Sequence, residues 1–266
     1  MRVAVLQFAP EFGDVRGNLT RMEVMIAREN AELFVAPELA LSGYTFESRD
    51  EALALAQEPD GAEFAGLARL AREKGAAVVV GFAEKDGPSV FNSSLLLAPD
   101  GSRTTYRKIH LFGREKRFFT PGDRPPQVVE VRRVRHGMMI CFDWIFPETA
   151  RSLAIMGADI ICHPANLVLP HCQDAMVTRC LENRVFGLTA NRTGIEKRAG
   201  ERLAFTGMSQ IVAPNGRILA RAGGDGDALL MADIAPEDAR DKWVTPSNHV
   251  LEDRRPDLYV LGGTRR

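Results

Sequence analysis

The order of hydrophobic and polar positions along the chain predicts strands and helices that alternate. Short apolar runs are followed by segments in which apolar residues recur every three to four positions, which is typical of a strand followed by an amphipathic helix. In residues 63–73, Phe64, Leu67 and Ala71 fall on one helical face, and Gly75 stands where a helix ends. The predicted strands are residues 2–8, 33–36, 77–82, 137–141 and 160–163, and the predicted helices are residues 18–30, 63–73, 147–156 and 174–186.

Two hairpins interrupt this alternation. Residues 93–98 and 103–108 flank the turn Pro99-Asp100-Gly101, and residues 209–213 and 218–220 flank Asn215-Gly216. Because hairpins add antiparallel pairs to an otherwise alternating chain, the pattern predicts an α/β fold with a mixed sheet covered by helices. In helix 174–186 the inward residues are expected to be Val177, Cys180, Leu181 and Val185.

Length and composition favour one domain that binds a small molecule. The 266 residues are 45% hydrophobic, which is enough for one large core, so a single domain over residues 1–266 is expected. Lys plus Arg number 34 and Asp plus Glu number 35, a balance that gives no field to attract nucleic acid or an anionic membrane. No run of ~18 apolar residues or signal peptide is visible, so a cytoplasmic location is expected.

The four cysteines, Cys141, Cys162, Cys172 and Cys180, are expected to be reduced thiols. They have neither the CxxC spacing of a zinc site nor the density of a disulfide scaffold.

Three reactive side chains follow predicted strands, where ligands of α/β folds gather. They are Glu38 after LFVAP, Lys108 at the end of the first hairpin and Cys141 at the end of MMIC. Taken singly, each has an ordinary explanation: a solvated loop glutamate, a protective edge-strand lysine and a buried inert thiol.

Together, the three side chains provide the groups that acyl transfer through a thioester requires: a nucleophile, a base and a cation at the developing oxyanion. A free thiol titrates near ~8.5, so a carboxylate must take its proton or an ammonium must favour the thiolate. Glu38 and Lys108 could serve those roles. Spacing alone leaves His110, His136 and His163 open as alternative bases.

Three longer motifs carry a family resemblance. PELALSGY (residues 37–44), YRKIHLFGREKRFFTPGD (106–123) and ICFDWIFPE (140–148) resemble, in that order, the nitrilase or carbon-nitrogen hydrolase superfamily. The resemblance continues through HPAN (163–166), LENRVF (181–186) and GMSQIVAPNGRIL (207–219). It implies a four-layer αββα sandwich with mixed sheets and a Glu-Lys-Cys triad, which falls on Glu38, Lys108 and Cys141.

The resemblance also implies further features of the site and the assembly. A second family glutamate matches Glu115, and no metal or organic cofactor is needed. The usual dimer face matches residues 147–156 and 174–186, so at least a homodimer is expected, with the tail from about residue 247 reaching the partner.

In the implied reaction, Glu38 takes the thiol proton and the sulfur of Cys141 attacks the carbonyl. Lys108 and the backbone N–H of Phe142 then stabilise the oxyanion, and Glu115 orients the amide and the water.

The implied substrate is a small neutral aliphatic amide, which is hydrolysed to an acid and ammonia. Relatives acting on ω-amides or N-carbamoyl amino acids often resemble CYDxRFPE, with an arginine that grips the substrate carboxylate, and Ile145 stands at that position here. The expected pocket wall is Phe142, Trp144, Ile145, Tyr44, Phe118 and Asn166. Nitrile hydrolysis is the second candidate, followed by N-carbamoyl amide hydrolysis and a non-catalytic binding role.

Overall fold

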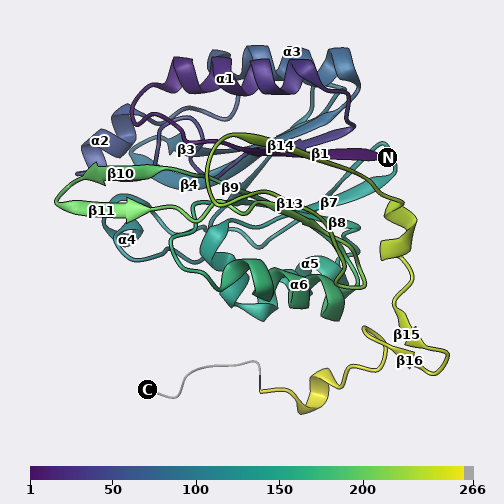
Figure 1. Cartoon of the computed structure of the whole chain (residues 1–266). Coiled ribbons are helices and arrows are strands. Elements are labelled where there is room, and N and C mark those ends of the chain that lie inside the picture. The colour runs from purple at the N-terminus through teal and green to yellow at the C-terminus, as the bar shows by residue number, and fades with distance from the viewer. Residues whose placement is uncertain (261–266) are drawn as a thin grey trace.

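The computed structural model describes residues 1–260, which form four layers, helix, sheet, sheet and helix (Figure 1). The last residues of the predicted domain, 261–266, lie outside the described part. The αββα sandwich implied by the family resemblance is therefore confirmed.

The first sheet has six strands in the order β14-β1-β2-β3-β4-β5. Strands β1, β2 and β3 run parallel to one another, whereas β14, β4 and β5 pair antiparallel with their neighbours. The strands are β1 (Arg2–Gln7), β2 (Leu33–Val35), β3 (Ala77–Asp86), β4 (Ser89–Leu97), β5 (Arg103–Arg107) and β14 (Ala228–Asp233).

The second sheet has the order β13-β12-β9-β8-β7-β6, and its central strands β7, β8 and β9 are parallel. The strands are β6 (Val128–Val131), β7 (Val134–Met138), β8 (Ile160–Ala165), β9 (Phe186–Asn191), β12 (Gln210–Val212) and β13 (Ile218–Arg221).

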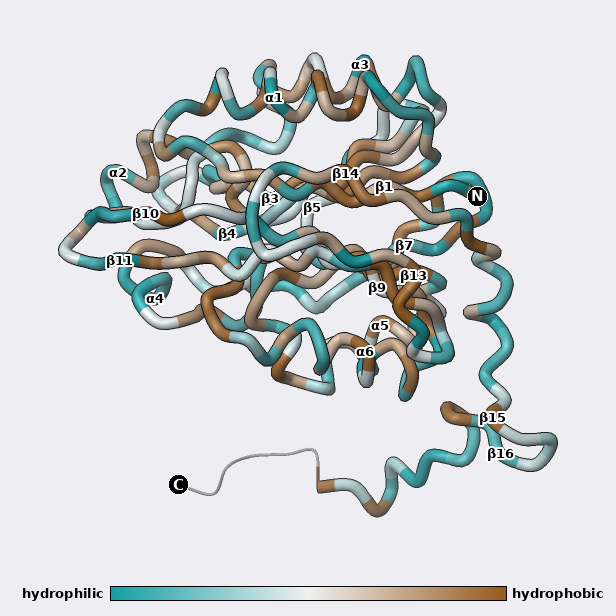
Figure 2. Tube along the Cα trace, viewed as in Figure 1, coloured by the Kyte–Doolittle hydropathy of each residue, from teal (hydrophilic) through white to brown (hydrophobic). Residues whose placement is uncertain are grey.

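Helices cover the outer face of each sheet (Figure 1). On the first sheet lie α1 (Val15–Arg28) and α3 (Ala65–Lys74), and on the second lie α5 (Pro147–Ile155) and α6 (Cys172–Asn183). One core joins the facing sheets, with Val5 and Val79 of the first packed together with Met138 and Ile161 of the second. In Figure 2, β1 and β14 are predominantly hydrophobic, whereas the helices mix hydrophobic and hydrophilic residues.

Shorter elements flank the sandwich. They are α2 (Arg49–Ala54), α4 (Glu115–Phe118), a hairpin of β10 (Ile195–Arg198) and β11 (Glu201–Ala204), and the 3₁₀ helices η1 (Ala62–Phe64) and η2 (Cys141–Ile145).

Beyond residue 240 the chain leaves the body as an extended arm (Figure 1). The arm contains β15 (Trp243–Thr245), β16 (Asn248–His249) and η4 (Pro256–Leu258), and follows η3 (Pro236–Ala239). Trp243, Val244 and Leu258 are exposed on it. No helix in residues 1–260 combines the length and the hydropathy needed to cross a bilayer.

Several predicted boundaries were wrong. Helix α6 ends at Asn183 instead of residue 186, because Arg184 adopts a left-handed conformation with φ 47° and Phe186 already belongs to β9. Leu181, which was predicted to face inward, is 49% exposed. Strand β7 ends at Met138, so Cys141 begins a 3₁₀ turn instead of ending a strand.

Candidate active site

Glu38 is held against strand β3 by close backbone contact. It follows β2, and the N–H of Gly81 on β3 donates to the Pro37 carbonyl at 3.1 Å, while Ala40 N–H donates to Gly81 O at 2.8 Å. A Cβ at position 81 would lie 2.4 Å from Glu38 Cα, so only glycine permits this approach. The carboxylate of Glu38 is thereby placed in a fully buried position.

Lys108 joins two buried carboxylates. Its backbone N–H donates to Asn92 O at 2.8 Å, which continues the pairing of β4 with β5 by one residue. Its ammonium donates to Glu38 Oε1 at 2.6 Å and to Glu115 Oε1 at 2.8 Å. Burial lowers the pKa of Lys108, but Glu115 and Glu38 outweigh burial and raise it well above its usual range. The ammonium therefore stays charged.

Glu115 is fixed on three sides. Besides Lys108, the Tyr44 hydroxyl donates to its Oε1 at 2.6 Å, and the Phe112 N–H donates to its Oε2 at 3.1 Å. Burial raises the pKa of Glu115, and the Lys108 ammonium opposes that rise. Burial and the Glu115 charge raise the pKa of Tyr44 well above 10, so its hydroxyl keeps the proton that it donates.

Glu38 retains one free oxygen. Oε1 accepts from Lys108 and, at 2.7 Å, from Asn92 Nδ2, whereas Oε2 is buried and has no hydrogen-bond partner within residues 1–260. Sequence analysis missed Asn92, because it stands inside a strand with nothing in its neighbourhood to distinguish it.

Cys141 occupies a strained backbone position. Its φ is 43°, in the left-handed region that non-glycine residues rarely adopt. His163 Nε2 lies 3.0 Å from the Cys141 carbonyl, and its Nδ1 lies 3.1 Å from the Thr189 hydroxyl. Burial lowers the pKa of His163 to about 4. The ring is thus neutral at pH 7, and its Nε2–H donates to the Cys141 carbonyl and helps to hold the strained turn.

Asp143 links the Cys141 turn to the Lys108 strand. Its Oδ2 accepts from Tyr106 Oη at 2.7 Å and from Ile140 N–H at 2.9 Å. Its Oδ1 accepts from the His110 N–H at 3.1 Å and lies 2.7 Å from His110 Nδ1. Sequence analysis gave Asp143 no role, although its place two residues after the cysteine was a usable signal.

The thiol of Cys141 is protonated at rest. Burial raises its pKa well above the usual value, Glu38 adds to the rise, and Lys108 and the backbone N–H of Asn166 oppose it. Of the two activation routes left open by the sequence, the surroundings favour removal of the proton by a base over a resting thiolate.

The predicted pocket residues divide between two hollows that meet at Phe112. A hollow of about 70 Å³ holds Cys141, Phe142, Trp144, Ile145 and Asn166. One of about 170 Å³ holds Tyr44, Phe118 and Glu115. The single predicted pocket is therefore two compartments. The lining residues missed by sequence analysis include Phe112, Leu169 and His171 in the first or shared wall and Phe46, Glu201 and Leu203 in the second.

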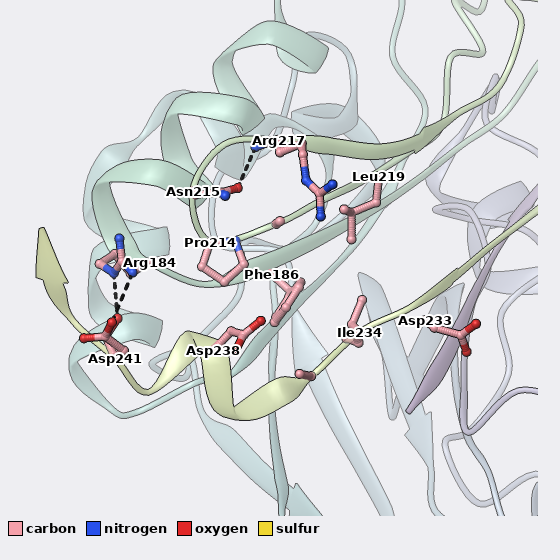
Figure 3. A pocket seen from close by; sticks show the side chains of 12 residues that line it. Arg184, Phe186, Pro214, Asn215, Arg217, Leu219, Asp233, Ile234, Asp238 and Asp241 are labelled. Atoms are coloured by element: carbon pink, nitrogen blue, oxygen red, sulfur yellow. Dashed lines mark hydrogen bonds and ion pairs between the residues drawn. The ribbon is translucent and has the colours of Figure 1, made fainter.

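A hollow of about 270 Å³ lies at the opposite end of the second sheet, beside Phe186 at the start of β9 (Figure 3). Its wall includes Arg184, which pairs with Asp241 at 3.6 Å, and it contains none of the predicted site residues. No cluster of metal-ligating side chains occurs in residues 1–260.

Comparison with known proteins places this geometry in a family. The carbon-nitrogen hydrolase family model matches residues 2–242. A protein called nitrilase from Pyrococcus abyssi is 41% identical, covering 97% of this chain and 99% of its own. An (R)-stereoselective amidase from a Pseudomonas species is 37% identical, covering 85% of this chain and 82% of its own.

A solved structure shows the same fold with a modified cysteine. It is a variant of the amidase from Nesterenkonia sp. AN1, with the acetamide moiety of fluoroacetamide added covalently at its active-site cysteine. Its TM-score is 0.80 and its identity 28%, covering 97% of this chain and 95% of that chain. The chain described here belongs to the carbon-nitrogen hydrolase family and is an enzyme of that class.

Proposed function

We propose that the enzyme hydrolyses a small neutral aliphatic amide to a carboxylic acid and ammonia through a thioester on Cys141. The observation that carries the proposal is the buried ammonium of Lys108, which bridges Glu38 and Glu115 at 2.6 and 2.8 Å. Two carboxylates around one cation provide a base and a second polar anchor beside a protonated thiol.

In the proposed first half-reaction, Glu38 Oε2 takes the proton of the Cys141 thiol while Sγ bonds to the carbonyl carbon. The Lys108 ammonium and the Phe142 N–H stabilise the oxyanion, and Glu38 returns the proton to the leaving nitrogen, which departs as ammonia. The free Oε2 of Glu38 supports its role as base, whereas both nitrogens of His163 and the Nδ1 of His110 are engaged elsewhere.

In the second half-reaction, Glu38 deprotonates a water molecule that adds to the thioester carbon. The acid leaves as the carbon–sulfur bond breaks, and the proton held by Glu38 passes to Sγ. Glu115 orients the amide and then the water; the Tyr44 hydroxyl and the Phe112 N–H fix its carboxylate for this purpose.

The surroundings of Cys141 support a neutral substrate. Of the described residues that line its hollow, none is Lys, Arg, Asp or Glu, and Ile145 is among them. The nearby arginines are already paired: Arg114 with Glu201 at 3.2 Å, Arg179 with Glu182 at 2.8 Å and Arg192 with Glu196. A substrate carboxylate would therefore have to displace an existing partner.

Nitrile hydrolysis is the second candidate, because the relative that is 41% identical is called a nitrilase. The same Sγ could add to a nitrile carbon while the thiol proton passes through Glu38 to the nitrile nitrogen. Addition of water to the resulting thioimidate and loss of ammonia would then give the shared thioester.

A panel of amides and nitriles assayed for released ammonia tests both candidates. Acetamide, propionamide and butyramide should be hydrolysed, and Cys141→Ala should abolish the release. Turnover of propionitrile but of no amide would replace the first candidate with the second, and turnover of neither would refute both.

We further propose a homodimer formed through α5 and α6. Ile155, Met156 and Leu181 on these helices are 48%, 44% and 49% exposed, which suits burial against a second copy. Light scattering at micromolar concentration should give at least twice the monomer mass of 29.3 kDa; a monomer mass would contradict the proposal.

A further inference from the structure

The β10–β11 hairpin presents one face to the hollow beside Glu115. Glu196 pairs with Leu203, and Arg198 pairs with Glu201. Residues that pair directly across two strands point to the same face, and neighbours along a strand alternate. Glu201 and Leu203 line the hollow, whereas Ile195 is 50% exposed, as expected for the opposite face.

The base of the hairpin is fixed to the loop that carries Tyr44. The Glu196 carboxylate accepts from the Tyr44 N–H at 3.1 Å and from the Thr45 N–H at 2.7 Å, and it pairs with the buried Arg192. The Arg192 guanidinium lies 4.0 Å from the ring centre of Phe205. Since Tyr44 also donates to Glu115, the hairpin and the catalytic carboxylate share one support.

The tip of the hairpin is held at the rim of the hollow. The Arg114 guanidinium donates to Ala199 O at 3.2 Å and pairs with Glu201 at 3.2 Å. Arg198 donates to Thr45 O at 3.2 Å and to Glu51 at 2.6 Å. Arg114 and Arg198 thus each have an anionic partner already.

The interior of this hollow is largely aromatic. Its volume is about 170 Å³, and its apolar wall consists of Phe46, Phe112, Phe118, Phe119, Leu203 and the Tyr44 ring. Phe112 also lines the hollow of Cys141, so its side chain is a wall that the two hollows share. An apolar chain attached to an amide at Cys141 could enter it and leave water.

We propose that this hollow is a second substrate subsite, which takes an uncharged apolar chain of the amide, and that Leu203 sets its length. This inference rests on the proposed amide hydrolysis. The chain could belong to the acyl group or to a substituent on the amide nitrogen; the contact with Leu203 is the same in both cases.

Amides of increasing length test the subsite. In the native sequence kcat/KM should rise about threefold to fourfold per methylene from acetamide towards hexanamide, in line with the ~0.8 kcal/mol gained per buried methylene. Leu203→Trp should lower the hexanamide-to-acetamide ratio of kcat/KM at least about tenfold, and Leu203→Ala should favour chains longer than hexanamide. Ile195→Trp, on the outward face of the same hairpin, is the matched control and should leave the ratio unchanged.

A parallel series with N-propylpropionamide identifies the chain that enters. If the Leu203 substitutions change kcat/KM for hexanamide alone, the hollow takes the acyl chain. If they change kcat/KM for N-propylpropionamide alone, the hollow takes the substituent on the amide nitrogen. Either result supports the subsite. The subsite would be refuted if the kcat/KM values relative to acetamide were the same, for both series, in the native protein, Leu203→Trp, Leu203→Ala and Ile195→Trp.

Binding separates failure of this inference from failure of the proposed function. If the native protein hydrolyses no amide, the proposed function is wrong. The rise in the unfolding temperature of the Cys141→Ala protein on adding hexanamide then tests binding in the hollow by itself. If adding Leu203→Trp to that protein does not reduce the rise, the subsite is refuted.

Discussion

Tyr106 donates a hydrogen bond of 2.7 Å to Asp143, and this contact joins the two sheets at the active site. Tyr106 belongs to β5, two residues before Lys108, and Asp143 lies two residues after Cys141. The position of Cys141 relative to the Lys108 ammonium therefore depends on the buried Asp143 carboxylate.

Asp143→Asn should reduce activity more than it changes substrate binding. Asp143 Oδ2 accepts from both Tyr106 and Ile140, so an amide N–H₂ at that place would face a donor and leave it unpaired, at a cost of about 1–3 kcal/mol. We expect kcat to fall at least about tenfold, with KM within about threefold, and the unfolding midpoint to decrease. Asp174→Asn, whose side chain is 88% exposed, is the control and should behave like the native protein.

Lys108→Met should lower kcat/KM by about 10²-fold or more, because one oxyanion donor is lost. The substitution also leaves Glu38 and Glu115 buried together, and the pKa of Glu115, which the Lys108 ammonium holds down, should rise further. The pH profile of any residual activity should shift accordingly. Lys85→Met, at an exposed position on β3, should have no such effect; a nearly active Lys108→Met protein would exclude the assigned role.

Iodoacetamide should modify Cys141 ahead of the other three thiols in the native protein. Burial raises the pKa of all four thiols, so accessibility decides which one reacts: Cys141 is 5% exposed at the wall of a hollow, whereas Cys162, Cys172 and Cys180 are fully buried. Peptide mapping should find loss of activity proportional to labelling at Cys141. The other thiols should react only in denaturant. Inactivation with an unlabelled Cys141 would contradict the assignment of the nucleophile.

A carboxylate on the substrate should reduce kcat/KM by roughly a hundredfold or more relative to the neutral isostere, because the charge would lose water without gaining a partner. Ile145 lines the Cys141 hollow and is 43% exposed, so Ile145→Arg should reduce the difference in kcat/KM between butyramide and succinamate. Preference of the native enzyme for succinamate would show that an arginine such as Arg114 reaches the substrate.

The free energy of unfolding should fall as the pH decreases from about 6.5 towards 4. Burial lowers the pKa of His136 and of His163 to about 4, whereas both titrate near 6.5 in the unfolded chain. In this range the unfolded state binds more protons, so each histidine costs up to about 2 kcal/mol at pH 5. The raised pKa of Glu115 acts in the opposite direction and reduces the net slope.

Urea unfolding at pH 7 and pH 5 measures this dependence. His136→Leu should remove about half of the difference in the free energy of unfolding between pH 7 and pH 5, since one of the two buried rings is lost. If the His136→Leu variant kept the full difference in the free energy of unfolding, groups other than His136 would control the stability of the protein in acid.

The sequence was most informative where function depends on local motifs. Glu38, Lys108 and Cys141 stand in the motifs PELALSGY, YRKIHLFGREKRFFTPGD and ICFDWIFPE, so the family resemblance singled them out, whereas spacing alone left histidines open as bases. Asn92 could not, since its contact with Glu38 joins residues 54 positions apart. The end of α6 was missed because Arg184 adopts a left-handed conformation that usually signals glycine.

The division of the site into two hollows was also beyond sequence analysis. It depends on where the β10–β11 hairpin and Phe112 lie in space, and neither has a periodic pattern of its own. Leu181 follows the helical period of α6 and yet is exposed, because periodicity identifies an apolar face without saying whether the same chain covers it.

The amide of Asn166, at the end of β8, donates to the backbone carbonyl of Glu38 at 2.9 Å. Glu38 and Lys108 thus come from one sheet, and Cys141 and Asn166 from the other. A chain in which either sheet had formed alone would lack half of the proposed reaction centre. Recovery of catalysis during refolding would therefore report the docking of the two sheets, whereas helix content alone would not.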